Sequence, residues 1–326
     1  MPSSFKNQTI NNNKENKMKK VLLALLSITL AFTAMQPSQA QDQKVLAILD
    51  TAINSKNFPS IIHEVCFTTV KSTIPKQNMS CPNGEYFMEG PGAASAPWPT
   101  TGPTWLNNGT YHGDQMVKAA LVNNPNIKIV FIRIHNITSL GNSSTLSNGE
   151  IILKGLDWVN KNASKYSIDA VSVSQAGVHT DPKTKAKSVH PGCQDLSGAF
   201  TNQVAQLNMI NVPTFIATGN DKQTFVGFPA CIPGVIGVGA LANETQLEGV
   251  TNTGNGLDMV APGRVDITKY NGSELKTAGS SVATVVSAAS YVNRNTFKTF
   301  GEYLASLQNI VINSVSYINN IPKSNK

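Results

Sequence analysis

The stretch Val45-Leu46-Ala47-Ile48-Leu49-Asp50 is an apolar run that ends in a carboxylate. It lacks polar alternation, which is typical of a strand buried on both faces of a parallel sheet. Four similar runs follow, at residues 127–134, 170–173, 213–217 and 235–238. We therefore predict that these five segments are strands of one sheet.

Helical patterns separate the predicted strands. Apolar residues recur at helical spacing in residues 115–121, 151–163, 196–207 and 282–292. Short buried strands that alternate with helices are typical of the α/β class. With no linker or internal repeat in view, we predict one α/β domain over residues 41–326. It has a mostly parallel central sheet with helices on both faces, and a polar tail that frays from Asn319.

The composition excludes several classes of protein. Of the 326 residues, 40% are hydrophobic and 14% are charged, which is too apolar for a disordered chain. The formal charge of +7 arises largely from five lysines in the first 40 residues. The remaining excess of basic residues is small and forms no dense block, so we expect no nucleic-acid partner. The cysteines form no CxxC pair, which argues against a zinc finger.

The N-terminal segment has the three parts of a secretory signal peptide. Lys19 and Lys20 precede an apolar run at residues 21–35, and small residues follow at 38–40. We expect translation to start at Met18 and cleavage to follow Ala40. The apolar run is shorter than the roughly 20 residues of a membrane span. We therefore expect a secreted protein, periplasmic or extracellular, without an integral membrane segment, the alternative being an uncleaved amphipathic anchor.

All four cysteines lie after the expected cleavage site. In an oxidising compartment an even number of cysteines indicates disulfides, here two, with three pairings open. We favour Cys66 with Cys81 and Cys193 with Cys231. Free buried thiols are the alternative.

Three polar residues stand where an α/β sheet gathers reactive groups. Asp50 ends a strand, whereas His112 and Ser281 each precede or begin a helical pattern. Acyl transfer uses a hydroxyl that attacks, an imidazole that accepts and returns its proton, and a carboxylate that orients the imidazole. Taken singly, each residue also has an ordinary structural interpretation, such as a helix cap for Ser281.

The motifs around these residues resemble those of subtilisin-type serine proteases, the subtilase family. The order Asp, His, Ser along the chain is the subtilisin order. The matching stretches are residues 46–53 (LAILDTAI), 112–113 (HG), 215–220 (FIATGN) with 228–240 (FPACIPGVIGVGA), 257–263 (LDMVAPG) and 279–284 (GSSVAT).

The resemblance implies a role for each matching residue. Ser281 would be the nucleophile, His112 the general base and then acid, and Asp50 the residue that orients His112. Asn220 would complete the oxyanion hole. Ser280 is a rival nucleophile, but the family pattern places the catalytic serine after a Thr-like position, which Ser280 occupies.

The resemblance also implies a segment that binds the substrate by backbone hydrogen bonds and hence selects proteins or peptides. It consists of Ser174, Gln175, Ala176 and Gly177. We expect a monomer that requires no cofactor. A structural calcium ion stays an option without an assignable position, so we assign no metal ligands. The other histidines match no motif and are interpreted as structural or surface residues: His63, His135, His179 and His190.

The sequence departs from the family pattern at three positions. Ala52 replaces a common glycine, which costs about 1 kcal/mol if the position needs a positive φ. Asp114 follows the His motif and, if it faces the imidazole, would favour the imidazolium and move activity to higher pH. Val285 replaces a common proline, which we expect to matter little. Asp50 also lies too close to the expected cleavage site for a propeptide domain.

These observations favour a secreted serine endopeptidase that forms an acyl-enzyme. The altered motifs leave one alternative of another class, a catalytically weak or inactive subtilase fold that binds peptides. Esterase activity on small acyl compounds is a third option, because it uses the same groups.

Overall fold

The computed structural model describes residues 44–71, 80–95, 112–137, 143–144, 149–194, 198–268, 274–293, 299–312 and 315–322. The expected signal peptide, with its start at Met18 and its cleavage after Ala40, lies outside these residues and stays a prediction. No helix among the described residues is both long enough and apolar enough to cross a membrane.

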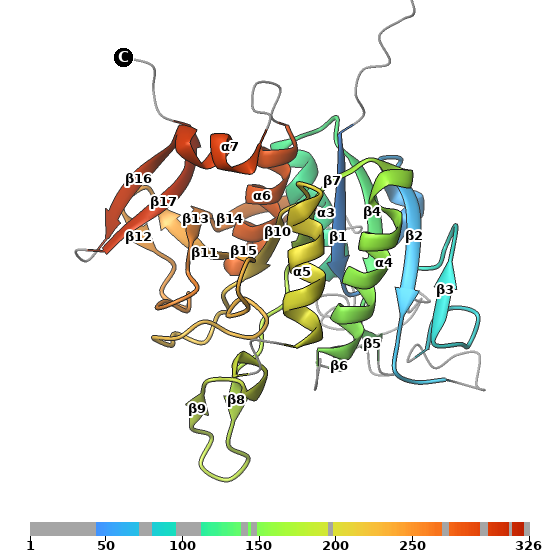
Figure 1. Ribbon diagram of the computed structural model, residues 1–326, viewed down its shortest axis with the longest axis horizontal. Coiled ribbons are helices and arrows are strands. Elements are labelled where there is room, and N and C mark those ends of the chain that lie inside the picture. The colour runs from blue at the N-terminus through green and yellow to red at the C-terminus, as the bar shows by residue number, and fades with distance from the viewer. Residues whose placement is uncertain are drawn as a thin grey trace, which may run out of the picture. The chain divides into compact units, whose positions relative to one another are not determined.

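An eleven-stranded sheet contains the predicted strands (Figure 1). Its order is β16-β17-β13-β11-β10-β7-β1-β4-β2-β3, with β12 paired to β11. All neighbours from β17 through β2 are parallel, whereas β16, β3 and β12 pair antiparallel. The strands are β1 (Val45–Asp50), β2 (Ile61–Phe67), β3 (Phe87–Glu89), β4 (Lys128–Arg133), β7 (Ile168–Val173), β10 (Thr214–Ala217), β11 (Ile236–Asn243), β12 (Gln246–Leu247), β13 (Met259–Pro262), β16 (Leu307–Ile312) and β17 (Val315–Pro322).

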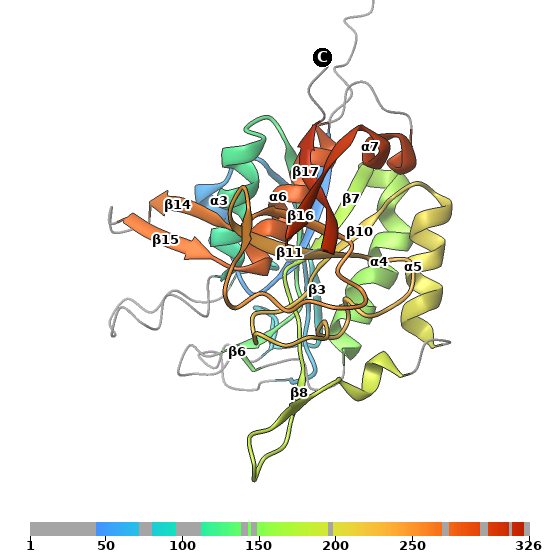
Figure 2. The ribbon, with the colours of Figure 1, turned by 90° about the vertical axis from the view of Figure 1, so that its left-hand side faces the viewer.

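Helices cover both faces of this sheet, as Figure 2 shows for α3 and α4. Along β1, Leu46 and Ile48 pack in one core with α3, α6 and α7, whereas Ala47 and Leu49 pack in a second core with α4 and α5. Because successive side chains of a strand point to opposite faces, this run without polar residues fills both cores. The helices are α3 (His112–Asn123), α4 (Glu150–Tyr166), α5 (Ala199–Met209), α6 (Ser280–Val292) and α7 (Phe300–Ser306).

Short elements connect these layers. They are the 3₁₀ helices η1 (Ser55–Asn57) and η2 (Pro191–Cys193) and three two-stranded ribbons: β5 (Asn136–Ile137) with β6 (Ser143–Ser144), β8 (His179–Thr180) with β9 (Lys187–Ser188), and β14 (Arg264–Thr268) with β15 (Glu274–Ala278).

The predicted α/β class and parallel sheet are confirmed. The five predicted strands correspond to β1, β4, β7, β10 and β11. Strand β2 was not among the predicted strands, because His63 and Glu64 interrupt its apolar run. Glu64 is nevertheless buried, and its carboxylate accepts hydrogen bonds from the backbone N–H groups of Gly92 and Ala94, at 2.8 and 3.1 Å.

The predicted frayed tail is wrong for its first residues. Strand β17 continues to Pro322, pairs with both β13 and β16, and places Asn319 opposite Val260. Asn319 is buried. Polar residues at the chain end are thus held by a strand partner about 60 positions earlier, which no local pattern indicates. Residues 323–326 lie outside the described part.

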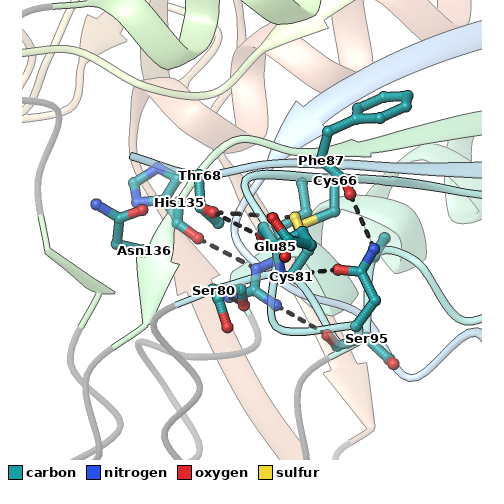
Figure 3. Close-up of a disulfide and its surroundings, with 12 residues drawn as sticks. Cys66, Thr68, Ser80, Cys81, Glu85, Phe87, Ser95, His135 and Asn136 are labelled. Atoms are coloured by element: carbon teal, nitrogen blue, oxygen red, sulfur yellow. Dashed lines mark hydrogen bonds between the residues drawn. A yellow bond between two sulfur atoms is a disulfide. The ribbon is translucent and has the colours of Figure 1, made fainter. Parts of the chain in front are cut away.

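Two disulfides join Cys66 to Cys81 and Cys193 to Cys231, the pairing that we favoured. Figure 3 shows the first of them. The first links β2 to the segment before β3. The second links η2 to the loop between β10 and β11. The first therefore holds a connecting segment close to the sheet, whereas the second joins two connecting segments to each other.

Candidate active site

Asp50 and His112 meet at the carboxyl edge of the sheet, where an α/β fold gathers its ligands. Asp50 is the last residue of β1, and His112 is the first residue of α3. His112 Nδ1 donates to Asp50 Oδ1 at 2.8 Å, and the backbone N–H of Thr51 donates to the same oxygen at 2.6 Å. The Asp50 carboxylate is fully buried, whereas the His112 side chain is 27% exposed. The carboxylate thus lies behind the imidazole.

This arrangement controls the protonation of His112. Burial by itself would lower the pKa of His112, but the charge of Asp50 and its hydrogen bond act in the opposite direction. The net result is a pKa above the ordinary value. A base with a raised pKa binds the proton that it abstracts more strongly, which suits general-base chemistry near neutral pH.

A close contact behind the imidazole fixes where α3 begins. The backbone N–H of Gly113 donates to Thr51 Oγ1 at 2.9 Å. A Cβ atom on Gly113 would lie 2.5 Å from Phe131 Cζ and 2.8 Å from the carbonyl oxygen of Ala52. Only glycine lets the helix approach β1 closely enough for His112 to reach Asp50.

Replacing Gly113 by alanine should therefore lower kcat/KM about 10- to 100-fold, because the displaced helix carries the imidazole away from Asp50. Steady-state hydrolysis of a peptide substrate measures this effect. Gly249→Ala is the matched control, since a Cβ there meets no atom within 4 Å. Equal activities for the two variants would contradict the packing argument.

Ser281 enters the same cleft at the start of α6. Its hydroxyl donates to the carbonyl oxygen of Ser174 at 3.1 Å, and the Ser174 hydroxyl donates to the carbonyl oxygen of Ser281 at 3.0 Å. The neighbouring Ser280 is fully buried, and its hydroxyl donates to Asn220 Oδ1 at 3.1 Å while accepting from the Gly219 N–H at 3.2 Å. Ser280 is thus occupied in structure, whereas Ser281 is half-buried and available to a ligand.

Asn220 lies beside the two serines. Its Oδ1 atom accepts from the backbone N–H of Ser280 at 2.9 Å, in addition to the Ser280 hydroxyl. Because the amide oxygen is occupied in this way, the NH₂ group is the part of Asn220 that remains to donate. Gly279, at φ +123°, permits this approach, since a Cβ there would lie 2.9 Å from the Asn220 amide. A hydrogen-bond donor thus lines the same cleft as Ser281.

A cleft of about 310 Å³ contains these groups. Its lining includes three residues of the predicted substrate segment, Ser174, Gln175 and Ala176. The other lining residues are Thr51, His112, Ala217, Gly219, Asn220, Asp221, Ser280 and Ser281. Gly177 pairs instead with Phe228 through two backbone hydrogen bonds of 2.8 Å, which hold this segment in place. The predicted site residues therefore come together from separate elements.

The departures from the family pattern have different consequences. Ala52 is not among the described residues with positive φ, so alanine introduces no strain there. Val285 is buried in the core that lies between α6 and the sheet. Asp114 is buried and accepts from the backbone N–H of Asn54 at 2.9 Å. Its carboxylate thus faces the backbone of Asn54, and Asp50 is the acidic group that raises the pKa of His112. The condition under which Asp114 would raise that pKa, a carboxylate that faces the imidazole, is therefore not met.

Asp114 instead makes stability depend on pH. Burial raises its pKa from 3.8 to about 7, against the lowering effects of the Asn54 hydrogen bond and of Lys118. Between pH 4 and pH 7 the folded chain keeps a proton that the unfolded chain has lost, so stability falls as pH rises. We expect Asp114→Asn to remove this dependence.

The free energy of unfolding of Asp114→Asn minus that of the parent should then be roughly 2–4 kcal/mol larger at pH 8 than at pH 4. Urea unfolding at both pH values measures this difference, with Asp266→Asn on the exposed face of β14 as the control. A gain that is the same at both pH values would exclude a buried proton on Asp114.

His135 is a buried neighbour of this site, which agrees with the structural one of the two interpretations that the sequence allowed. His135 follows β4, the strand that pairs with β1. Its side chain is buried, and the charge of Asp50 acts on its pKa. Burial lowers the pKa of His135 to about 4, although the charge of Asp50 acts to raise it. His135 therefore stays neutral at neutral pH. Its place after the carboxyl end of a central strand was the available sequence signal.

The described residues contain no group of three or more His, Cys, Asp or Glu side chains that could hold a metal ion. The groups brought together at the cleft are a carboxylate, an imidazole, a hydroxyl and an amide. These are the side chains of acyl-transfer chemistry.

Comparison with known proteins identifies the family. A model of the subtilase family matches residues 42–302, so this chain belongs to the subtilase family. An alkaline proteinase of Hapsidospora chrysogena is 30% identical over 151 residues, which are 44% of this chain and 33% of that protein. A subtilisin-like serine protease of Penicillium rubens is 26% identical over 185 residues, which are 54% of this chain and 42% of that protein. The matches therefore span less than half of these two relatives.

Solved structures show the same fold. A cold-adapted subtilisin-like serine proteinase superimposes with a TM-score of 0.56 at 18% identity, covering 87% of this chain and 90% of that chain. At this identity the likeness concerns the fold.

Proposed function

We propose that this protein is a secreted serine endopeptidase in which Asp50, His112 and Ser281 form the catalytic triad. The observation that carries the proposal is the convergence of the Ser281 hydroxyl, the Asn220 amide and the Asp50-bound imidazole of His112 in one cleft. Family membership supports the reaction class.

The first half of the reaction forms an acyl-enzyme. Ser281 Oγ attacks the carbonyl carbon of the scissile peptide bond, and its proton passes to Nε2 of His112. The C–N bond then breaks as the imidazolium returns this proton to the leaving amine. Asp50 keeps the other imidazole proton on Nδ1 and stabilises the imidazolium charge. Before attack, the Ser281 hydroxyl turns from the carbonyl oxygen of Ser174 toward His112.

Negative charge that develops on the substrate oxygen is stabilised from two directions. The Asn220 amide is one donor, and the backbone N–H of Ser281 in the first turn of α6 is the second. Donors of this kind contribute about 10²- to 10³-fold to kcat. Asn220 is held ready because Ser280 binds its amide oxygen.

The second half of the reaction releases the acyl group. A water molecule gives one proton to His112 and adds its oxygen to the acyl carbon, after which Ser281 recovers the proton. Side chains and water carry every proton and electron pair, so the proposed reaction requires no cofactor. All the groups that the proposed reaction uses lie on one chain, so the reaction needs no second subunit.

The segment Ser174, Gln175 and Ala176 supports peptides as the substrate class. It extends from the end of β7 along the cleft, and its far end is secured by the Gly177 pairing with Phe228. An extended peptide can bind such an edge through its backbone whatever its side chains are. The two disulfides support an oxidising, extracytoplasmic location.

A fluorophosphonate probe tests this proposal on the purified chain. We expect one adduct, mapped by mass spectrometry to Ser281 and lost in Ser281→Ala and His112→Ala. Ser280→Ala is the matched control, and there the adduct should remain on Ser281. A folded chain that forms no adduct would favour a peptide-binding module, whereas ester turnover without protein cleavage would indicate an esterase.

A further inference from the structure

The β8–β9 hairpin follows the substrate segment almost directly. Its strands pair His179 with Ser188 and Thr180 with Lys187. In Figures 1 and 2 it extends away from the sheet, on the side toward which β1 runs. At its tip, the Asp181 carboxylate accepts from the backbone N–H groups of Lys183 and Thr184, at 2.8 and 2.7 Å. The tip is therefore an ordered turn.

Both ends of this hairpin are attached to the same piece of chain. At its start, Gly177 pairs with Phe228. At its end, the His190 ring stacks on the Phe228 ring with centroids 4.9 Å apart, and the disulfide joins Cys193 to Cys231. These contacts give the hairpin a defined position relative to the cleft.

The hairpin carries an excess of positive charge. Lys187 Nζ binds Asp221 Oδ1 at 2.5 Å, and Asp221 lines the cleft next to Asn220. This pair neutralises the acidic residue of the cleft wall. Lys183 and Lys185 are exposed, and among the described residues neither has an acidic partner.

The charge of Asp181 is the single negative charge on the hairpin, and it faces the backbone of the turn. Its pKa is lowered chiefly by those backbone hydrogen bonds. Backbone hydrogen bonds orient the Asp181 carboxylate without cancelling its charge, so Lys183 and Lys185 together with Asp181 leave one net positive charge at the hairpin tip. The base of the hairpin is fixed to the cleft residue Asp221 through Lys187.

We propose that the β8–β9 hairpin is a docking element that favours substrates with acidic residues flanking the cleaved segment. This inference rests on the proposed function, since it concerns a peptide bound in the same cleft. Opposite charges at such an exposed site increase the rate of encounter and add modest affinity. Both effects decrease with ionic strength, because the Debye length falls from about 30 Å at 0.01 M to about 3 Å at 1 M salt.

Matched fluorogenic peptides test the inference. Each contains one bond that the enzyme cleaves in an unfolded protein, with three Glu or three Gln placed four to six positions before or after that bond. The test variant is the double substitution Lys183→Gln with Lys185→Gln. The control is Lys56→Gln with Lys161→Gln, which removes the same charge from exposed positions on η1 and α4.

For the parent chain we expect kcat/KM to be about 5- to 10-fold higher with Glu than with Gln in one of the two flanks at about 0.02 M salt. At about 0.5 M salt the ratio should fall below about 2. The hairpin variant should show a ratio below about 2 at both salt concentrations, whereas the control variant should keep the parental ratio. An unchanged ratio in the hairpin variant, or a preference for Gln, would overturn the inference.

Binding separates this inference from the proposed function. The same peptides, carrying a fluorescent label, are titrated onto the Ser281→Ala variant with and without the hairpin substitutions. Tighter binding of the Glu peptide that depends on the two lysines supports docking even if no peptide is hydrolysed. Hydrolysis without any charge preference would retain the proposed function and reject the docking element.

Discussion

Asp50→Asn should lower kcat about 10⁴-fold while the chain remains folded. The carboxylate holds the Nδ1 proton of His112 at 2.8 Å and leaves Nε2 free to accept the Ser281 proton. An asparagine amide can donate to Nδ1 and so favour the tautomer that is protonated at Nε2, which cannot act as the base. The loss is therefore expected mainly in kcat.

The same variant should change the pH profile. Because Asp50 raises the pKa of His112, activity falls as the pH decreases through that raised value. Without the carboxylate charge, the imidazole loses its proton more readily, so the acid limb of kcat/KM moves to lower pH. Rates measured from pH 4 to pH 9 follow this limb.

Asp157→Asn on α4 is the control, since Asp157 is a partly exposed carboxylate paired with Lys161. It should keep the parental rate and profile. A loss below about 10-fold in Asp50→Asn would mean that Asp50 does not orient the base.

Arg133→Met should lower the free energy of unfolding by about 3–5 kcal/mol. Arg133 is 1% exposed, and its guanidinium donates to the carbonyl oxygens of Ser80, Ser95 and His135 at 3.1, 2.9 and 3.1 Å. Figure 3 shows these three residues around the Cys66–Cys81 disulfide. Methionine would leave all three carbonyl groups without this donor in a buried place.

Loss of the Arg133 hydrogen bonds should also disturb the segment that follows Asp50 in the active site. Ser95 pairs with Ile53, and the backbone N–H of Ile53 donates to the carbonyl oxygen of Ala94 at 3.2 Å, shortly after Asp50. Urea unfolding with the disulfides intact measures the stability. Arg133→Lys should recover only part of it, because an ammonium group lacks the planar fork.

Arg264→Met serves as the control, since this arginine is exposed and pairs with Glu248. Its midpoint of unfolding should match that of the parent. An equal effect of the two methionine variants would show that the buried hydrogen bonds of Arg133 contribute little.

The strands and the site differ in how far the sequence predicts them. A run such as residues 45–50 carries its own signal, because a strand between two helical layers must be apolar throughout. The motifs that contain Asp50, His112 and Ser281 are local too, and their order indicated the family. Strand β2 escaped detection because Glu64 is a buried polar residue whose partners, the N–H groups of Gly92 and Ala94, lie almost 30 positions away.

The direction in which a side chain points was harder to predict. Asp114 stands next to the His motif in the sequence, yet its carboxylate binds the backbone of Asn54, 60 positions earlier. From the sequence, only the resemblance distinguished the two adjacent serines. In the structure they differ, because the hydroxyl of Ser280 is bound to Gly219 and Asn220. Such outcomes depend on which distant segments pack together.

The sequence by itself determined the α/β class, the central strands and the residue types of the site, because strand burial and motif chemistry are local properties of the chain. Only the tertiary structure decided which groups share the cleft, which arginine is buried, and where the basic hairpin lies. These depend on contacts between residues that are tens of positions apart, such as Asp50 with His112 and Lys187 with Asp221. Folding brings them together through the pairing of whole strands and helices, which the pattern of a single segment does not record.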